Sequence, residues 1–279
     1  LLDIVDTNPT FRKQIKAWLK AGVIDWTHPP EVYQKTTQGT PQGGVISPLL
    51  ANIALHGLEN YLKNWLWEEK KYRISVWNAT KQKWGTAKQS QTKATLSIIR
   101  YADDFVIIHK DLEILNEAKV VAEEFLKTIG LHINNEKTHI VSSKEGFDFL
   151  GVNIRHFETG LYRSDENLKG EKTGLVRLIQ PSKEAILKQY RKIADTLDNL
   201  KNVSIDVVIS KLNPIIRGFS NYYRHYSSTE KMNVLDTLIF RKLLRWAKRR
   251  HPNKGMKWVA KKYFLTHSTK QKWGFSNGN

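Results

Sequence analysis

Apolar side chains recur at helical spacing in some parts of this chain and at strand-like spacing in others. Residues 47–70 and 112–129 carry an apolar residue every three or four positions, which predicts helices with one buried face. Between them, the runs LSIIR and FVIIH flank the polar step YADD at residues 101–104. This arrangement predicts a tight β-hairpin, and both of its arms are expected to be buried.

Three further segments complete the first part of the pattern. Residues 70–95 are polar and basic without sustained periodicity, which predicts a solvated excursion or a loose hairpin. HIV at 139–141 and FDFLGVNI at 147–154 predict strands. The order of helix, strand pair, helix and strands favours an α+β fold with an antiparallel sheet over a parallel α/β sheet.

The pattern after about residue 180 is almost purely helical. One helix is expected after Pro181-Ser182, and a third over residues 230–250. Between them an apolar stripe from Val208 to Tyr223 predicts a second helix, which Pro214 must start, kink or break. We therefore place a domain boundary at about residue 180.

Basic charge is concentrated after this boundary. The chain has 45 Lys and Arg against 27 Asp and Glu, a formal net charge of +18. Residues 180–279 hold 21 basic and 6 acidic residues, so they contribute +15, and residues 1–179 contribute +3. Such a charge favours a polyanionic partner, either nucleic acid or an anionic membrane surface.

Composition excludes several classes of protein. No apolar run approaches the roughly 20 residues that cross a bilayer, and the opening residues lack the order of a secretory signal. The absence of cysteine excludes a disulfide framework, a thiolate zinc site and a cysteine nucleophile. We expect a soluble, unsecreted chain with no membrane partner.

The adjacent carboxylates Asp103 and Asp104 carry the strongest chemical signal. Two carboxylates held together at the tip of an apolar hairpin favour a hard cation, Mg²⁺ above all. Divalent ions held by aspartates serve phosphoryl and nucleotidyl transfer. The alternative is that Asp-Asp is simply a polar turn between two strands.

The context of this pair resembles a known family. YADD, preceded by GTPQGGVISPLLANIAL and followed by GLHINNEKTHIV and FDFLGVNI, resembles the palm of a reverse transcriptase. With NPIIRGFSNYYRHYSS and RWAKRRHPNK downstream, the chain resembles the group II intron-encoded reverse transcriptase/maturases over residues 12–265. The resemblance implies a partial palm at 1–179, a helical thumb or maturase domain at 180–265, and the start of a DNA-binding region at 266–279.

The resemblance also implies roles for individual residues. Asp103 and Asp104 would be the metal-binding, catalytic carboxylates, and Lys137 would approach the leaving pyrophosphate. Positions near the template and the incoming nucleotide would be Tyr101, Ala102, Thr40, Pro41, Gln42, Gly43 and Gly44. The segment that supports the primer would be Phe149, Leu150 and Gly151.

The helices after residue 180 would grip RNA. The resemblance and the charge together favour phosphate contacts by Arg217, Arg224, His225, Arg241, Lys242, Arg245, Lys248, Arg249 and Arg250. Aromatic residues lie among them and could stack on unpaired bases. For Tyr222, Tyr223, Tyr226 and Trp246 we favour a place in the helical core.

The family pattern is incomplete in this sequence. A further essential aspartate of the family lies upstream of the helix FRKQIKAWLKAGVI and has no counterpart here, so the metal site is expected to be incomplete and the chain inactive alone. An upstream fingers and palm chain or a homodimer would complete it, and the exposed palm surface would associate. No endonuclease module is expected.

Two functions are therefore compared. The first is an RNA-directed DNA polymerase that uses Mg²⁺, dNTPs and an RNA template with a DNA primer, and that binds group II intron RNA to assist splicing and mobility. The second is an RNA-binding maturase that does not polymerise. Either would act in a ribonucleoprotein of the bacterial cytoplasm, or in an organelle.

Overall fold

The described part of the chain forms two compact units, residues 1–140 and 141–279. This computed structural model describes residues 7–20, 23–25, 32–34, 47–78, 80–159, 164–166, 170–265 and 274–276. Among these residues, no helix is long and apolar enough to span a membrane.

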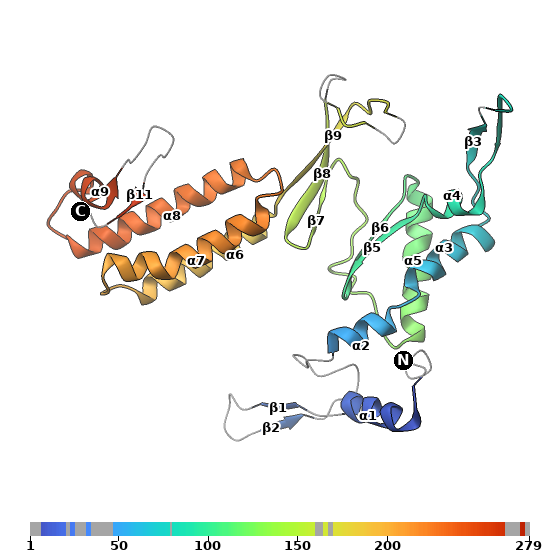
Figure 1. Cartoon of the computed structure of the whole chain (residues 1–279), viewed down its shortest axis with the longest axis horizontal. Coiled ribbons are helices and arrows are strands. Elements are labelled where there is room, and N and C mark those ends of the chain that lie inside the picture. The colour runs from blue at the N-terminus through green and yellow to red at the C-terminus, as the bar shows by residue number, and fades with distance from the viewer. Residues whose placement is uncertain are drawn as a thin grey trace. The chain divides into compact units, whose positions relative to one another are not determined.

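The first unit alternates helices with two-stranded antiparallel sheets, which pair β1 with β2, β3 with β4 and β5 with β6 (Figure 1). Its elements are α1 (Pro9–Lys20), β1 (Val23–Asp25), β2 (Val32–Gln34), α2 (Ser47–Ala54), α3 (Leu58–Glu68), β3 (Ser75–Asn78), β4 (Lys83–Thr86), α4 (Gln89–Lys93), β5 (Ser97–Tyr101), β6 (Asp104–Ile108) and α5 (Leu112–Thr128).

The core of this unit lies between α3, α5 and one face of the β5–β6 hairpin. Helix α5 begins where the carboxylate of Asp111 accepts a hydrogen bond from the backbone of Glu113, as an N-cap residue does. The fully or largely buried core side chains are Leu58, Leu62, Trp65, Leu66, Leu96, Ile114, Ala118 and Ala122. Ile98, Phe105 and Ile107 of the hairpin pack against this cluster.

Two expectations for this unit were wrong. The predicted helix over 47–70 is two helices, because Gly57 adopts a left-handed φ of 98° between α2 and α3. The β5–β6 hairpin forms as predicted, but its arms are buried on one face alone: Ile99 is 51% exposed and Ile108 44% exposed. A two-stranded sheet that packs on helices with one face leaves its alternate side chains in solvent.

The second unit begins with a three-stranded antiparallel sheet and continues as helices. Its elements are β7 (Phe147–Phe149), β8 (Val152–Glu158), β9 (Leu175–Pro181), α6 (Lys183–Asn199), α7 (Ile205–Tyr223), α8 (Thr229–Arg250), α9 (Met256–Tyr263), β10 (Phe264–Leu265) and β11 (Gly274–Phe275). Apolar faces of α6, α7, α8 and α9 form one core, which includes Ile193, Leu197, Val208, Leu243, Trp246 and Val259.

The strand predictions for this unit were partly wrong. HIV at 139–141 is not a strand, and none of the described strands pairs with it. FDFLGVNI is not one strand but the whole of β7, a two-residue turn and the start of β8. Strand β9 was not predicted, although it pairs with β8 along its whole length.

The helix predictions hold better. Helix α6 starts where Ser182 Oγ accepts a hydrogen bond from the backbone N–H of Ala185 at 3.1 Å. Pro214 lies inside α7 and neither starts nor breaks it. The fold is α+β, with small antiparallel sheets followed by a helical region, as the sequence predicted.

Candidate functional site

The YADD segment forms a two-residue hairpin turn. Tyr101 of β5 pairs with Asp104 of β6, so Ala102 and Asp103 make the connection. Ala102 has a φ of 53°, in the left-handed region that favours glycine. Both carboxylates are exposed, and so is Tyr101, at 64%. The turn therefore presents two adjacent carboxylates to solvent at the end of a hairpin that packs on the core.

Arg100 fixes this turn and was missed in the sequence. Its Nη1 atom donates to the carbonyl oxygen of Ala102 at 2.9 Å and to Asn52 Oδ1 of α2 at 2.7 Å. The side chain thus bonds the turn to the helix that follows the PQGG segment. The sequence signal that could have identified it is a single arginine at the end of the apolar run LSIIR, three positions before Asp103.

The carboxylate pair suits a hard divalent cation. Mg²⁺ prefers oxygen ligands and is commonly held by one or two carboxylates together with substrate phosphates. Asp103 and Asp104 could supply the first part of such a set. In the described part of the chain, no third His, Asp or Glu joins them to make a larger ligand cluster.

Of the other predicted catalytic and nucleotide-binding positions, Lys137 lies within the described residues. Thr40, Pro41, Gln42, Gly43 and Gly44 lie outside the described residues. Lys137 is exposed in a turn at 135–137, where Asn134 accepts hydrogen bonds from the backbone. Its side chain is therefore accessible to an anion.

Phe149, Leu150 and Gly151 form the tip of the β7–β8 hairpin. Phe149 pairs with Val152, so Leu150 and Gly151 are the turn residues, with φ of 50° and 78°. This pair of positive φ angles is that of a type I′ turn.

The end of helix α7, 72 residues along the chain, holds this second turn. Tyr223 Oη donates to the carbonyl oxygen of Gly151 at 3.0 Å, and Tyr222 Oη donates to that of Leu150 at 3.4 Å. Burial raises the pKa of the Tyr223 hydroxyl, and the neighbouring Tyr222 adds to the shift. Tyr223 is 5% exposed, so it is a core residue as predicted; the same prediction was wrong for Tyr222, which is 56% exposed because it lies on the outer side of this turn contact.

The basic residues of α8 divide into two groups. Lys242, Lys248 and Arg250 bond within the protein: Lys242 pairs with Asp198, Lys248 donates to carbonyl oxygens after the helix, and Arg250 lies over the Trp246 ring. Arg241, Arg245 and Arg249 are exposed. Arg217, Arg224 and His225 at the end of α7 and after it are exposed too.

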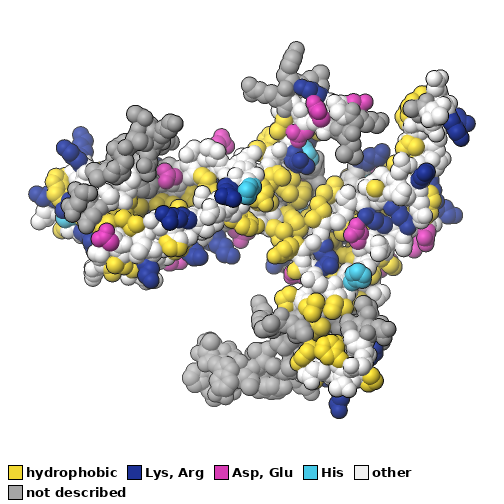
Figure 2. Space-filling model, viewed as in Figure 1, with side chains coloured by type: hydrophobic (Ala, Val, Ile, Leu, Met, Phe, Trp, Pro, Cys, Tyr) yellow, Lys and Arg dark blue, Asp and Glu magenta, His cyan; other side chains and the backbone are white. Residues whose placement is uncertain are grey.

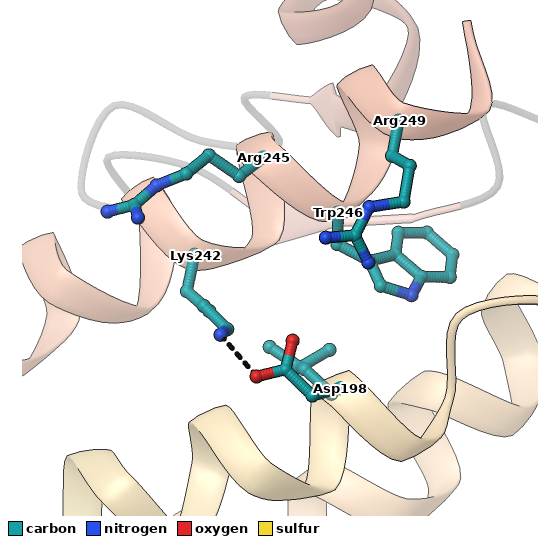
Figure 3. Close-up of a pocket in the computed structure, with 6 residues that line it drawn as sticks. Asp198, Lys242, Arg245, Trp246 and Arg249 are labelled. Atoms are coloured by element: carbon teal, nitrogen blue, oxygen red, sulfur yellow. Dashed lines mark hydrogen bonds and ion pairs between the residues drawn. The ribbon is translucent and has the colours of Figure 1, made fainter.

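A shallow pocket of about 100 Å³ between α6 and α8 carries two of these arginines (Figure 3). Arg245 and Arg249 line it, and Lys242 points across it to Asp198, 2.8 Å away. The hydrogen bond from Lys242 lowers the pKa of the Asp198 carboxyl, and the nearby cations lower it further. Because Lys242 neutralises Asp198, the arginines keep an excess positive charge on this face.

Trp246 also lines this pocket. It is 4% exposed, and its Nε1–H donates to the carbonyl oxygen of Leu200 at 2.7 Å. The prediction that this aromatic residue belongs to the core is confirmed. Its buried ring holds α8 against the end of α6, so the exposed arginines project from a fixed helix.

Two family models match the chain. The model described as "Reverse transcriptase (RNA-dependent DNA polymerase)" matches residues 4–154. The model described as "Group II intron, maturase-specific domain" matches residues 186–264. The first match contains the YADD turn and the second contains the exposed arginines of α8.

Several proteins are similar over large parts of the chain. The group II intron-encoded protein LtrA of Lactococcus lactis subsp. cremoris is 29% identical over 280 residues, which cover 81% of this chain and 45% of that protein. The protein YkfC of Escherichia coli (strain K12) is 36% identical over 149 residues, 48% of this chain and 35% of its own length. An uncharacterised 91 kDa protein in a cob intron of Schizosaccharomyces pombe is 28% identical over 255 residues, 76% of this chain and 30% of that protein. The chain spans less than half the length of each of these relatives.

Proposed function

Because the chain belongs to the reverse transcriptase family, we propose that it is the part of a group II intron-encoded RNA-directed DNA polymerase that holds the catalytic aspartates and the intron-binding helices. The observation that carries this proposal is the strained YADD turn, which presents Asp103 and Asp104 at the end of a packed hairpin. The substrates would be dNTPs and an RNA template with a DNA primer.

The residues of the first unit suggest a division of labour. Asp103 and Asp104 would hold Mg²⁺, which neutralises the triphosphate and lowers the barrier to attack by the primer hydroxyl. Tyr101 and Ala102 would lie against the incoming nucleotide, Arg100 would keep the turn in place, and the exposed Lys137 would stabilise the negative charge of the leaving pyrophosphate.

The second unit would hold nucleic acid. The Phe149–Gly151 turn, fixed by Tyr222 and Tyr223, would support the primer strand. The exposed arginines of α8 would contact the phosphates of the duplex and of intron RNA, since Asp198, the one carboxylate among the described residues that line their pocket, is already paired with Lys242. The chain would therefore work in a ribonucleoprotein.

A second function is favoured by the same arginines. A maturase that binds intron RNA without polymerising needs the exposed arginines Arg241, Arg245 and Arg249, which we call the α8 face, and does not need the aspartates. In that case Asp103→Asn leaves RNA binding and assisted splicing unchanged, and loss of the α8 arginines removes both.

Primer extension on an RNA template tests the polymerase. The chain and the same chain extended by its upstream coding sequence are compared with Mg²⁺, each with Asp103→Asn and with the control Asp195→Asn, which removes an exposed carboxylate of α6. We expect extension by the longer chain, at least a hundredfold loss for Asp103→Asn and no loss for Asp195→Asn. Extension that survives Asp103→Asn would refute the assignment.

Salt dependence of RNA binding tests the second unit. Arg245→Gln with Arg249→Gln should weaken binding and reduce the slope of log K against log salt by about 1.4 to 1.8, as for two lost phosphate contacts. Lys13→Gln with Lys16→Gln removes the same charge from exposed positions of α1 and is the control. Equal slopes for the two double variants would show that the α8 face does not bind phosphate.

A further inference from the structure

The hairpin of β3 and β4 carries two exposed tryptophans that no role assigned above uses. Trp77 pairs directly with Trp84 across the two strands, and their ring centroids lie 5.8 Å apart at an interplanar angle of 65°. Trp77 is 50% exposed and Trp84 is 67% exposed. Both rings therefore offer apolar faces to solvent, although each also touches the other.

The charged residues near these rings in the sequence are all cationic. Residues 70–102 contain eight Lys or Arg and no Asp or Glu. Four of these cations are engaged elsewhere: Lys70 pairs with Glu117 of α5, Arg73 lies over the Trp67 ring, and Lys93 and Arg100 donate to Asn64 and Asn52. Lys81 and Lys83 sit between the tryptophans along the chain and are exposed. Figure 2 shows hydrophobic and basic side chains together on this arm.

The hairpin is attached to the unit at its base and extends away from α3 and α5 (Figure 1). Ala87 N donates to the carbonyl oxygen of Ile74 at 2.9 Å, and Ala87 is 4% exposed. The four residues of β4 are all exposed. The arm is thus fixed at one end and open to a ligand along the strand that carries Trp84.

A cross-strand aromatic pair also stabilises a hairpin by itself. That role requires the two rings to touch, but it does not require lysines around them or the absence of every carboxylate. Exposed aromatic rings with basic neighbours are what proteins use to stack unpaired bases and to contact the phosphates between them. Paired bases in a duplex do not present their faces, so the fit is to single strands.

We propose that the β3–β4 hairpin binds unpaired RNA, with bases stacked on Trp77 and Trp84 and phosphates paired with Lys81 and Lys83. This inference rests on the proposed function for one premise, namely that the polyanion bound by this chain is RNA. The ligand would be a single-stranded stretch of template or of intron RNA, bound outside the YADD turn and outside the α8 face.

The test is fluorescence anisotropy with labelled oligouridylate and with a matched RNA duplex. Trp77→Val with Trp84→Val replaces the rings by β-branched residues, which also favour strands. It should weaken binding of the single strand by at least the roughly fivefold to hundredfold expected for the loss of one stacked base, with the duplex affinity and the salt slope unchanged. Trp77→Tyr with Trp84→Tyr should restore most of the loss, and circular dichroism verifies the fold of each variant.

A second pair separates charge from stacking. Lys81→Gln with Lys83→Gln should reduce the salt slope for the single strand by about 1.4, as expected for two phosphates of a single strand. Unchanged single-strand binding by the valine variant overturns the proposal, as does an equal loss on the duplex or binding of anionic vesicles in preference to oligouridylate. If the valine variant binds normally while the Arg245/Arg249 variant does not, this inference fails and the proposed function stands.

Discussion

Backbone strain at two hairpin turns is matched by side chains that bond to the strained residues. Ala102 and Leu150 are not glycines, yet both adopt the left-handed region. This conformation costs about 1–3 kcal/mol and persists only where the surrounding structure holds the residue in it. Arg100 donates to the carbonyl oxygen of Ala102, and Tyr222 donates to that of Leu150. These turns are the proposed catalytic and primer-supporting segments. The two donors would therefore hold the backbone of each segment in its strained conformation.

Gly151→Ala tests how tightly the second turn is held. Gly151 has a φ of 78°, and a Cβ atom there would lie 2.8 Å from Tyr223 Oη. We expect a loss of about 1–3 kcal/mol in the free energy of unfolding. Gly218→Ala is the control, because its Cβ would meet nothing within 4 Å inside α7 and should stabilise the helix by about 0.5–1 kcal/mol. Urea denaturation measures both, and similar midpoints would contradict this account of the turn.

Arg100→Met tests the first turn. The substitution keeps an unbranched, largely apolar side chain and removes the hydrogen bonds to Ala102 and Asn52, so we expect the first unit to lose about 1–2 kcal/mol. In the upstream-extended chain, the rate of primer extension should fall while affinity for RNA stays constant. Arg177→Met, which changes an exposed arginine of β9, is the control and should alter neither quantity. A normal extension rate for Arg100→Met would show that the turn does not need its anchor.

At the scale of helices and strands, local signals were sufficient wherever the element packs by one periodic face. Helices α5, α6 and α8 and the β5–β6 hairpin follow from apolar spacing and from cap residues such as Ser182. The spacing failed at Gly57, because Leu55 and Leu58 continue the apolar pattern through a break that depends on one φ angle.

Elements that depend on distant partners could not be predicted. Strand β9 exists through its pairing with β8, and HIV at 139–141 has the composition of a strand but no such partner among the described strands. For the site, the YADD turn follows from the sequence, whereas the bond from Tyr223 to Gly151 joins residues 72 positions apart. Patterns of neighbouring residues carry no information about a contact between residues so far apart in the sequence.

The connection between α8 and α9 contains a histidine whose charge is disfavoured in the folded state. His251 Nε2 lies 2.8 Å from Tyr263 Oη, and its ring packs on Trp258. Burial lowers the pKa of this imidazole below its ordinary 6.5, and the charges of Lys262, Arg250 and Lys254 lower it further. The unfolded chain therefore takes up a proton at this residue at a higher pH than the folded chain does.

This difference predicts a loss of stability in mild acid. The contribution of His251 is fully present above about pH 6.5 and is lost as the pH falls from there through the folded pKa. Urea midpoints at pH 7.5 and 5.5 should differ more for the parent chain than for His251→Asn. His225→Asn removes an exposed histidine and should keep the parent's pH dependence. Parallel pH profiles for the parent and His251→Asn would exclude this residue as the cause.

At the scale of the whole molecule, our proposals divide the basic charge between one surface of each unit. The α8 face carries charge without exposed aromatic rings, which suits duplex and folded RNA, whereas the β3–β4 arm combines charge with exposed rings, which suits single strands. An intron-encoded polymerase would meet both forms of RNA, in the folded intron and in the template ahead of the primer. The two surfaces should differ in their ligands while sharing a steep dependence on salt.

The extent of the second folded unit gives the last prediction. A boundary at residue 180 would cut β9 close to its end, leave β8 and most of β9 on the other side of the cut, and break the bonds that tie α7 to the sheet, among them Tyr223 to Gly151. The unit that begins at residue 141 keeps these contacts and its own core. We therefore expect residues 141–279 to unfold in one cooperative transition.

Residues 180–279 should unfold at a lower urea concentration than residues 141–279. In the shorter chain Tyr223 and Ser227 lose their hydrogen-bond acceptors, the carbonyl oxygens of Gly151 and Ile179. Circular dichroism at 222 nm compares the two chains, and Tyr223→Phe in residues 141–279 measures how much of the difference comes from that single hydrogen bond. Equal midpoints would mean that the helices fold without the sheet, and the boundary at 180 would then be the structural one.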